Sequence, residues 1–333
     1  MPDSIEVQAS PVPSSHEDSL LAGVELPLQA MYYPYGFPVE LSTNSRHVLE
    51  AAAQSWRLFS RSFDETPLRV CLGVAESGGA QLPPRPKFRS RGHLMSIISN
   101  PENFMVCDFS RGYAFGWVTR RVAVNAAFLR RHFLEAAALT VIEQLHLAAI
   151  HGALIARGEC GIVLCGATMV GKSTLAYACA RAGWTLVSDD GTFLLRNRTD
   201  CHGVGNPHSI NLRSEAKHLF PELTGRPVTT RPGGKVGIEV ATKELPIRIA
   251  TGSPIRHVVF LRRGDGVGAC LGKYPKEEAL AWFESHAFYG EDHVREEQRR
   301  SYARLLNANV WEMHYRNLNE AVDRLERLAS SGV

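Results

Sequence analysis

The stretch Gly161–Thr174 reads GIVLCGATMVGKST and decides how the rest of the chain is interpreted. Its first part, Gly161–Cys165, is a short apolar run typical of a buried strand. The remainder has glycines at 166 and 171 followed by a lysine and a serine, which is the G-x-x-x-x-G-K-S spacing of a phosphate-binding loop. The strand, loop and following helix together predict a site for a nucleoside triphosphate. The alternative is a glycine-rich turn that binds no ligand.

This loop has a physical reason for its residue types. The glycines allow backbone N–H groups to surround phosphate oxygens, Lys172 reaches the β- and γ-phosphates, and the Ser173 hydroxyl is a ligand for Mg²⁺. A helix beginning near Lys172 points its positive end at the same anion. We therefore expect ATP to contact the nine loop residues Gly166, Ala167, Thr168, Met169, Val170, Gly171, Lys172, Ser173 and Thr174.

A pair of aspartates follows the next expected strand. Leu175–Arg181 continues the helix, and Trp184–Ser188 is predicted to form a strand that ends at Asp189 and Asp190. Adjacent residues point to different sides, so one carboxylate can hold Mg²⁺ while the other deprotonates an attacking hydroxyl. A solvated Asp-Asp-Gly turn is the alternative.

A histidine precedes the loop. The segment Ala148–Ile155 reads AAIHGALI and is interpreted as a helix that ends at His151 and Gly152. It is followed by a predicted hairpin of Ala153–Ala156 and Cys160–Cys165. This arrangement places His151 near the phosphate site, although a histidine beside an apolar helix end is by itself more typical of a cap or a packed side chain.

The order of these motifs resembles the catalytic domain of the HPr kinase/phosphorylase family. That family's pattern is His-Gly, a hairpin, a loop ending in G-K-S and a strand ending in L-V-x-D-D. The segment His151–Asp190 has the same order. A weaker similarity follows at Ile210–Ala216 (INLRSEA). The resemblance implies an α/β fold akin to phosphoenolpyruvate carboxykinase and transfer of the γ-phosphate of ATP to a hydroxyl, commonly that of a serine. It places His151, Lys172, Asp189 and Asp190 in the catalytic site and Arg213, which matches a family lysine, at the substrate. Family members often form hexamers, so a homo-oligomer is possible.

The acceptor and the roles of the aspartates stay open. Residues 1–120 do not resemble the amino-terminal domain of HPr kinase, so the acceptor is a protein, a peptide or a small molecule. We expect Asp189 to accept the proton and Asp190 or Ser173 to hold Mg²⁺, and the two aspartates can exchange these roles. A P-loop ATPase and a nucleotide-sensing regulatory protein are the alternative functions.

The pattern of elements predicts two domains. We expect a disordered lead-in at 1–25, a small α+β domain at 26–124, a connecting helix at 125–150 and the catalytic domain at 151–330. In the first domain the predicted elements are a helix at 44–63, a loop at 76–91 and strands at 31–41, 67–74, 93–99, 104–109 and 113–119. In the second domain the predicted strands after residue 190 are 192–195, 236–240, 257–261 and 310–315, with helices at 214–220, 276–288, 292–306 and 317–329.

Composition excludes several classes of function. The 333 residues carry a formal net charge of only +3, and the basic run Arg85–Arg91 is interpreted as a solvated loop, so no nucleic-acid partner is expected. The longest apolar stretch is interrupted by polar residues, so no membrane span is predicted. Seven cysteines without a C-x-x-C pair favour a reduced, cytoplasmic setting. Cys201, His202 and His208 fit no common zinc spacing, which leaves Mg²⁺ as the expected metal.

Overall fold

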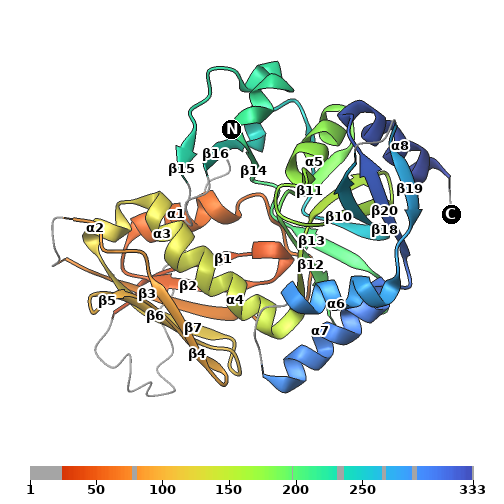
Figure 1. Ribbon diagram of the computed structural model, residues 1–333. Helices are drawn as coiled ribbons and strands as arrows, with labels where there is room; N and C mark the ends of the chain where they lie inside the picture. The colour runs from red at the N-terminus through yellow and green to blue at the C-terminus, as the bar shows by residue number, and fades with distance from the viewer. Residues whose placement is uncertain are drawn as a thin grey trace. The chain divides into compact units, whose positions relative to one another are not determined.

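The chain forms two structural units of mixed α/β type. A computed structural model describes residues 25–76, 81–196, 198–230, 236–264, 268–286 and 291–331. It divides into Met1–Leu145 and His146–Val333 (Figure 1). The lead-in expected at 1–25 lies, apart from Glu25, outside the described residues.

The first unit contains a seven-stranded sheet. Its strands lie in the order β1, β2, β3, β7, β6, β5, β4. Helices α1, α3 and α4 lie over one face of it (Figure 1). The core forms between the two layers. The bounds are β1 Leu28–Tyr32, β2 Val39–Thr43, β3 Leu68–Ala75, β4 Lys87–Arg91, β5 Leu94–Asn100, β6 Asn103–Asp108, β7 Tyr113–Thr119, α1 Arg46–Trp56, α3 Ala126–Leu129 and α4 Glu135–His146.

Two expectations for this unit are wrong. The single strand expected at 31–41 is two strands, β1 and β2, because a 3-10 turn at Pro34–Gly36 separates them and Gly36 has a positive φ of 90°. The basic run expected as a loop contains strand β4, which pairs antiparallel with β5. Its alternation of basic and other side chains suits an exposed edge strand.

The connecting helix expected at 125–150 is also different. It is interrupted by a π-helical turn at Arg130–Leu134 and ends at His146, and Leu147–His151 forms strand β8. β8 pairs antiparallel with β12, Gly191–Leu195, which lies far along the chain. A short apolar run buried on both faces has no period that separates strand from helix, so this distant pairing decides its structure.

The second unit is built on a ten-stranded mixed sheet. Eight strands lie in the order β17, β11, β9, β10, β18, β13, β12, β8, and β20 pairs with β18 and with β19. A smaller sheet has the order β14, β16, β15. The remaining bounds are β9 Ala153–Arg157, β10 Cys160–Cys165, β11 Thr185–Ser188, β13 His202–Gly205, β14 Ser209–Leu212, β15 Thr229–Thr230, β16 Val236–Ala241, β17 Arg248–Ile249, β18 Gly252–Arg263, β19 Cys270–Lys273 and β20 Asn309–Tyr315.

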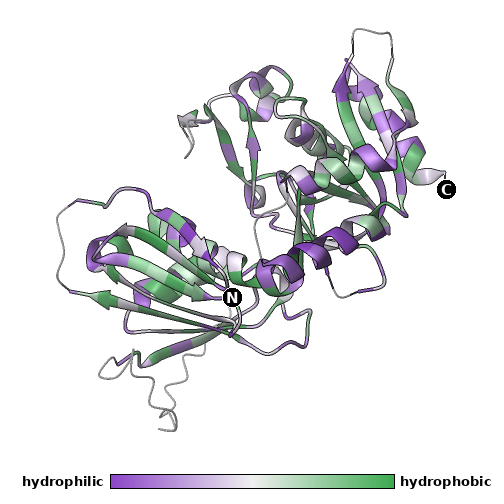
Figure 2. Ribbon diagram, turned by 60° about the horizontal axis from the view of Figure 1, so that its bottom comes forward, coloured by the Kyte–Doolittle hydropathy of each residue, from purple (hydrophilic) through white to green (hydrophobic). Residues whose placement is uncertain are grey.

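Helices cover both faces of this sheet. Ile162 and Leu164 of β10 pack in the core under α5, Lys172–Arg181, and α8, Leu318–Ser330. Val163 and Cys165 face the opposite core, under α6, Lys276–His286, and α7, Asp292–Leu305. The central strands are largely green in Figure 2, whereas α7 is largely purple, as expected for a polar helix that shields an apolar sheet.

Most local predictions for this unit are confirmed. The hairpin has Arg157 opposite Cys160, and the strands expected at 192–195, 236–240, 257–261 and 310–315 are present. The helix expected at 214–220 is instead a 3-10 turn at Ser214–His218. No helix of the described ranges is long and apolar enough to cross a membrane. All seven cysteines are free thiols.

Candidate functional site

The loop between β10 and α5 requires its glycines. Gly166 and Gly171 have positive φ values of 132° and 105°, and Met169 has one of 77°. A Cβ atom at Gly166 would lie 2.9 Å from the carbonyl oxygen of Leu261, and one at Gly171 would overlap the hydroxyl of Tyr315. Both positions therefore exclude other residues on grounds of backbone conformation and of space.

Lys172 lies at the centre of this loop. Its side chain is 7% exposed, and Nζ donates hydrogen bonds to the carbonyl oxygens of Gly166 at 2.8 Å and Ala167 at 3.3 Å. A buried ammonium group needs such partners to offset the loss of water. The loop backbone therefore surrounds the ammonium group of Lys172.

A network of hydroxyl groups aligns the turns on either side of the loop. The Ser188 hydroxyl lies 2.7 Å from that of Thr192 and accepts a hydrogen bond from the Leu154 N–H at 3.1 Å. The Thr192 hydroxyl donates to the carbonyl oxygen of Gly152 at 3.0 Å. These bonds connect the turn after β8 with the turn after β11, so His151 and the two aspartates are brought to one edge of the sheet.

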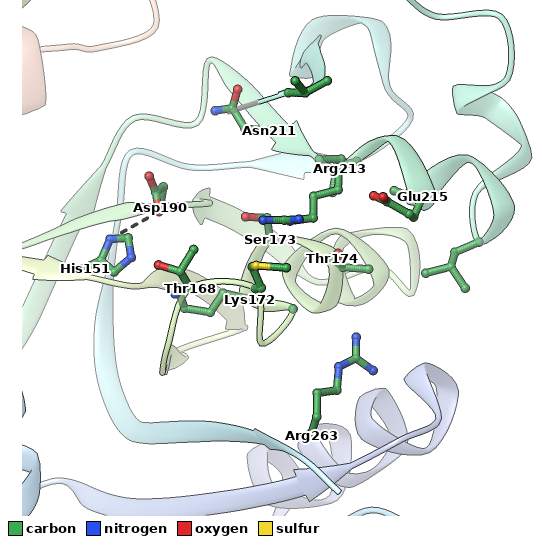
Figure 3. Close-up of a pocket in the computed structure, with 16 residues that line it drawn as sticks. His151, Thr168, Lys172, Ser173, Thr174, Asp190, Asn211, Arg213, Glu215 and Arg263 are labelled. Carbon is green, nitrogen blue, oxygen red and sulfur yellow. Dashed lines mark ion pairs between the residues drawn. The ribbon is translucent and has the colours of Figure 1, made fainter. Parts of the chain in front are cut away.

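The two aspartates have different surroundings. Asp189 is 7% exposed, and its Oδ2 accepts a hydrogen bond of 2.6 Å from the Asn211 N–H. Its backbone carbonyl oxygen accepts one of 3.3 Å from the Ser173 hydroxyl. The Asp190 side chain is 62% exposed, and its Oδ1 lies 3.4 Å from Nδ1 of His151 (Figure 3).

His151, Lys172, Ser173 and Asp190 border a pocket of about 390 Å³. The pocket brings together most residues predicted from the sequence, namely His151, Thr168, Met169, Gly171, Lys172, Ser173, Thr174, Asp190 and Arg213. The predicted residues Gly166, Ala167, Val170 and Asp189 do not line it. In Figure 3, Lys172 and Ser173 lie between the His151–Asp190 pair on one side and Arg213 and Arg263 on the other.

The pocket also contains residues that the sequence analysis missed. Asn211, Glu215 and Arg263 line it, together with the apolar side chains of Leu212, Ala216, Leu219 and Val236. Arg263 is the last residue of β18, the strand beside β10, and its guanidinium lies 4.7 Å from the centre of the Tyr315 ring. The rule that sites form at the carboxyl ends of neighbouring strands could have identified Arg263.

His286 is a further neighbour that local patterns did not indicate. It is the last residue of α6, and its ring is stacked on that of His151, with the ring centres 5.9 Å apart and the planes at 9°. Its Nδ1 lies 2.8 Å from the carbonyl oxygen of Trp282. His151 therefore lies between a carboxylate and a second imidazole.

The charges in the pocket favour an anionic ligand. Lys172, Arg213 and Arg263 are cationic, whereas Asp190 and Glu215 are anionic. The cations are grouped around the N-terminus of α5, where the helix dipole also attracts negative charge. Ser173 and Asp190 offer the hard oxygen atoms that Mg²⁺ prefers. Within the described ranges, no cluster of three or more His, Cys, Asp or Glu side chains has the arrangement of a metal site.

A weak similarity to solved structures is found, without a match to a known family or curated protein. The chain matches no protein-family model and no curated protein. Among solved structures, it is similar to the Hpr(Ser) kinase/phosphatase from Coxiella burnetii, with 15% sequence identity and a TM-score of 0.29. The match covers 55% of this chain and 99% of that one.

Proposed function

We propose that this protein is an ATP-dependent kinase that transfers the γ-phosphate of ATP to a hydroxyl group, that of a serine in a protein or peptide acceptor. The observation that carries the proposal is that Lys172, inside its glycine-rich loop, and the His151–Asp190 pair line the same pocket. A cationic phosphate cradle beside a carboxylate meets the requirements of in-line phosphoryl transfer, namely charge stabilisation and a proton acceptor.

The triphosphate binds along the loop. Lys172 exchanges its bonds to Gly166 and Ala167 for bonds to β- and γ-phosphate oxygens, and the backbone N–H groups at the start of α5 add to the cradle. Arg213 and Arg263 contribute further positive charge. The apolar side chains of Ala216, Leu219 and Val236 offer a surface for the nucleoside.

The oxygen donors of the site fit Mg²⁺. The Ser173 hydroxyl and an aspartate carboxylate are the protein ligands that we assign to the ion, which would neutralise charge on the phosphates. Ser173 lines the pocket and donates to the backbone carbonyl of Asp189, so the buried Asp189 lies directly beside the phosphate end of the pocket without lining it.

The geometry favours Asp190 over Asp189 as the proton acceptor. The acceptor oxygen attacks the γ-phosphorus, its proton passes to the Asp190 carboxylate, and ADP leaves. Asp190 lines the pocket and contacts His151, whereas the carboxylate of Asp189 is already engaged by the Asn211 N–H. This gives Asp190 the proton-accepting role first expected for Asp189. The buried Asp189 is left beside Ser173, whose hydroxyl we assign to the metal.

A transfer experiment tests this proposal. The purified protein is incubated with Mg²⁺, γ-labelled ATP and clarified host extract, beside the variants Lys172→Ala and Asp190→Asn. We expect label in a protein or peptide fraction with the unmodified chain and in neither variant. Label in a small metabolite would identify a small-molecule kinase instead.

Two other outcomes would contradict a kinase. Release of free phosphate without a labelled acceptor would indicate an ATPase. ATP that is bound but left intact, with equal binding by the Asp190→Asn variant, would indicate a nucleotide sensor. Binding measured by calorimetry separates this last case from a chain that binds no nucleotide.

A further inference from the structure

The seven-stranded sheet of the first unit ends in an unusual edge strand. β4 is the last strand in the order and pairs with β5 on one side only. Within the described residues, no strand pairs with its outer edge. All five residues of β4 are exposed. The outer edge therefore presents backbone N–H and C=O groups that another extended chain can bond.

The side chains of β4 divide the edge into two chemically distinct sides. Lys87, Arg89 and Arg91 alternate along the strand and share one face of the sheet, because every second residue points the same way. Their partners on β5 are Ile98, Ser96 and Leu94. Leu94 and Ile98 are 42% and 43% exposed, so the three cations stand beside accessible apolar surface.

The opposite side of β4 carries Phe88 and Ser90. Phe88 pairs with Ile97, which is fully buried, yet Phe88 itself is 45% exposed. Its ring therefore lies at the edge of the core, and the described neighbours leave part of it accessible. A strand added beside β4 would meet cations on one face and an aromatic ring on the other.

We propose that the outer edge of β4 binds an extended polypeptide segment in which acidic and apolar residues alternate. Backbone hydrogen bonds to β4 supply the pairing, as in other cases of strand addition. Carboxylates at every second position lie beside Lys87, Arg89 and Arg91, and an apolar side chain between them packs on Phe88. This binding goes beyond the phosphoryl transfer proposed above and does not depend on it.

The positive charge of β4 favours an acidic peptide over a second copy of this chain. Two β4 strands paired edge to edge would bring together Lys87, Arg89 and Arg91 from both copies, and like charges opposite each other oppose pairing. An anionic lipid or a nucleic acid would meet the cations but would leave the backbone groups of the edge without partners. An acidic strand provides negative charge for the cations and backbone partners for the edge.

Fluorescence anisotropy of the full chain tests the proposal. The probe is a fluorescein-labelled peptide EVEFEVE, and the comparison peptides are KVKFKVK, with inverted charge, and EEEEFVV, with the same composition but no alternation. We expect EVEFEVE to bind more tightly than either and binding to weaken as salt is raised. A labelled oligothymidylate and phosphatidylserine vesicles complete the set, with no comparable binding expected.

A pair of variants locates the binding site. Arg89→Glu together with Arg91→Glu should weaken EVEFEVE binding about tenfold and strengthen KVKFKVK binding, because two exposed charge pairs are reversed. The matched control is Arg46→Glu with Arg57→Glu, two exposed positions on and just after α1 in the same unit. The control should bind both peptides as the unmodified chain does.

The gain of KVKFKVK binding keeps the test valid, since a variant that failed to fold would lose both peptides. If EVEFEVE and EEEEFVV bound equally well, the proposal that the peptide pairs with β4 as an added strand would be overturned. If the control variant lost EVEFEVE binding to the same extent, the assignment of the binding site to β4 would be overturned. Absence of EVEFEVE binding, or tighter binding of the oligonucleotide or the vesicles, would overturn the proposed occupant.

Discussion

The Tyr315 hydroxyl donates a hydrogen bond of 2.9 Å to the carbonyl oxygen of Val170. Tyr315 is the last residue of β20, and Val170 lies within the loop before α5, so this bond fastens the loop to the end of the sheet. Tyr315 is 1% exposed, and burial raises the pKa of its hydroxyl, which therefore remains a donor. This bond therefore helps to fix the shape of the loop.

Loss of this bond should loosen the loop. We expect Tyr315→Phe to lower the free energy of unfolding by about 0.5–1.5 kcal/mol, the usual net contribution of one buried hydrogen bond. We also expect ATP to bind more weakly. Urea unfolding and calorimetry measure the two effects, and unchanged ATP affinity would show that the bond does not shape the site.

The conformation of Gly171 leads to a second prediction. Gly171→Ala places a Cβ where φ is positive and where the Tyr315 hydroxyl lies. We expect the loop to shift, with a cost of about 1–3 kcal/mol in stability and a loss of ATP binding. Gly268→Ala is the matched control, because Gly268 also has a positive φ but no atom near the added Cβ. The control should lose stability only and keep ATP affinity.

The two aspartates should respond differently to the same substitution. Asp190→Asn should reduce the rate of transfer by about 10²–10⁴-fold with little change in stability, because an exposed proton acceptor is removed. Asp189→Asn should cost about 1–3 kcal/mol in stability, because the neutral amide accepts the Asn211 N–H less strongly than the buried carboxylate does and its NH2 group needs a partner of its own. Single-turnover rates and unfolding curves of both variants check this. The reverse pattern would return the proton-accepting role to Asp189.

Stability should fall on the acid side because of His257. This residue is 2% exposed, and its Nδ1 accepts a hydrogen bond of 3.3 Å from Trp311 Nε1. Burial lowers the pKa of His257, and Lys273 and Arg256 lower it further. The unfolded chain therefore takes up the proton first, so stability is full above about pH 6.5 and declines as the pH falls below that value, by at most about 1.4 kcal/mol per pH unit.

Thermal unfolding between pH 7 and 5 measures this decline. The variant His257→Gln should make it less steep, because the amide does not titrate, whereas His132 and His202, whose pKa burial also lowers, still contribute. His218→Gln, at an exposed position, should leave the slope as it is. A slope that is the same in all three chains would show that other groups cause the decline.

The structure explains which elements local patterns could predict. The hairpin of β9 and β10, the glycine loop and the helix that follows it are encoded by neighbouring residues, because turn conformation and apolar periodicity act over a few positions. The segment Leu147–His151 is not, since its apolar residues suit a helix and a buried strand equally. Its pairing with β12 makes this segment a strand. The basic strand β4 was missed for the same reason, because β5 supplies its hydrogen bonds.

Local residue patterns were enough to predict the loop, with its glycines, Lys172 and Ser173, and two carboxylates at the end of the next strand. They could not predict that Asp190 contacts His151 while Asp189 is engaged by Asn211, or that Arg263 and His286 approach the site from β18 and α6, because these contacts depend on how the elements pack. The physical reason is distance along the chain. A turn is set by adjacent backbone angles, whereas the environment of a side chain is set by whichever distant element packs against it.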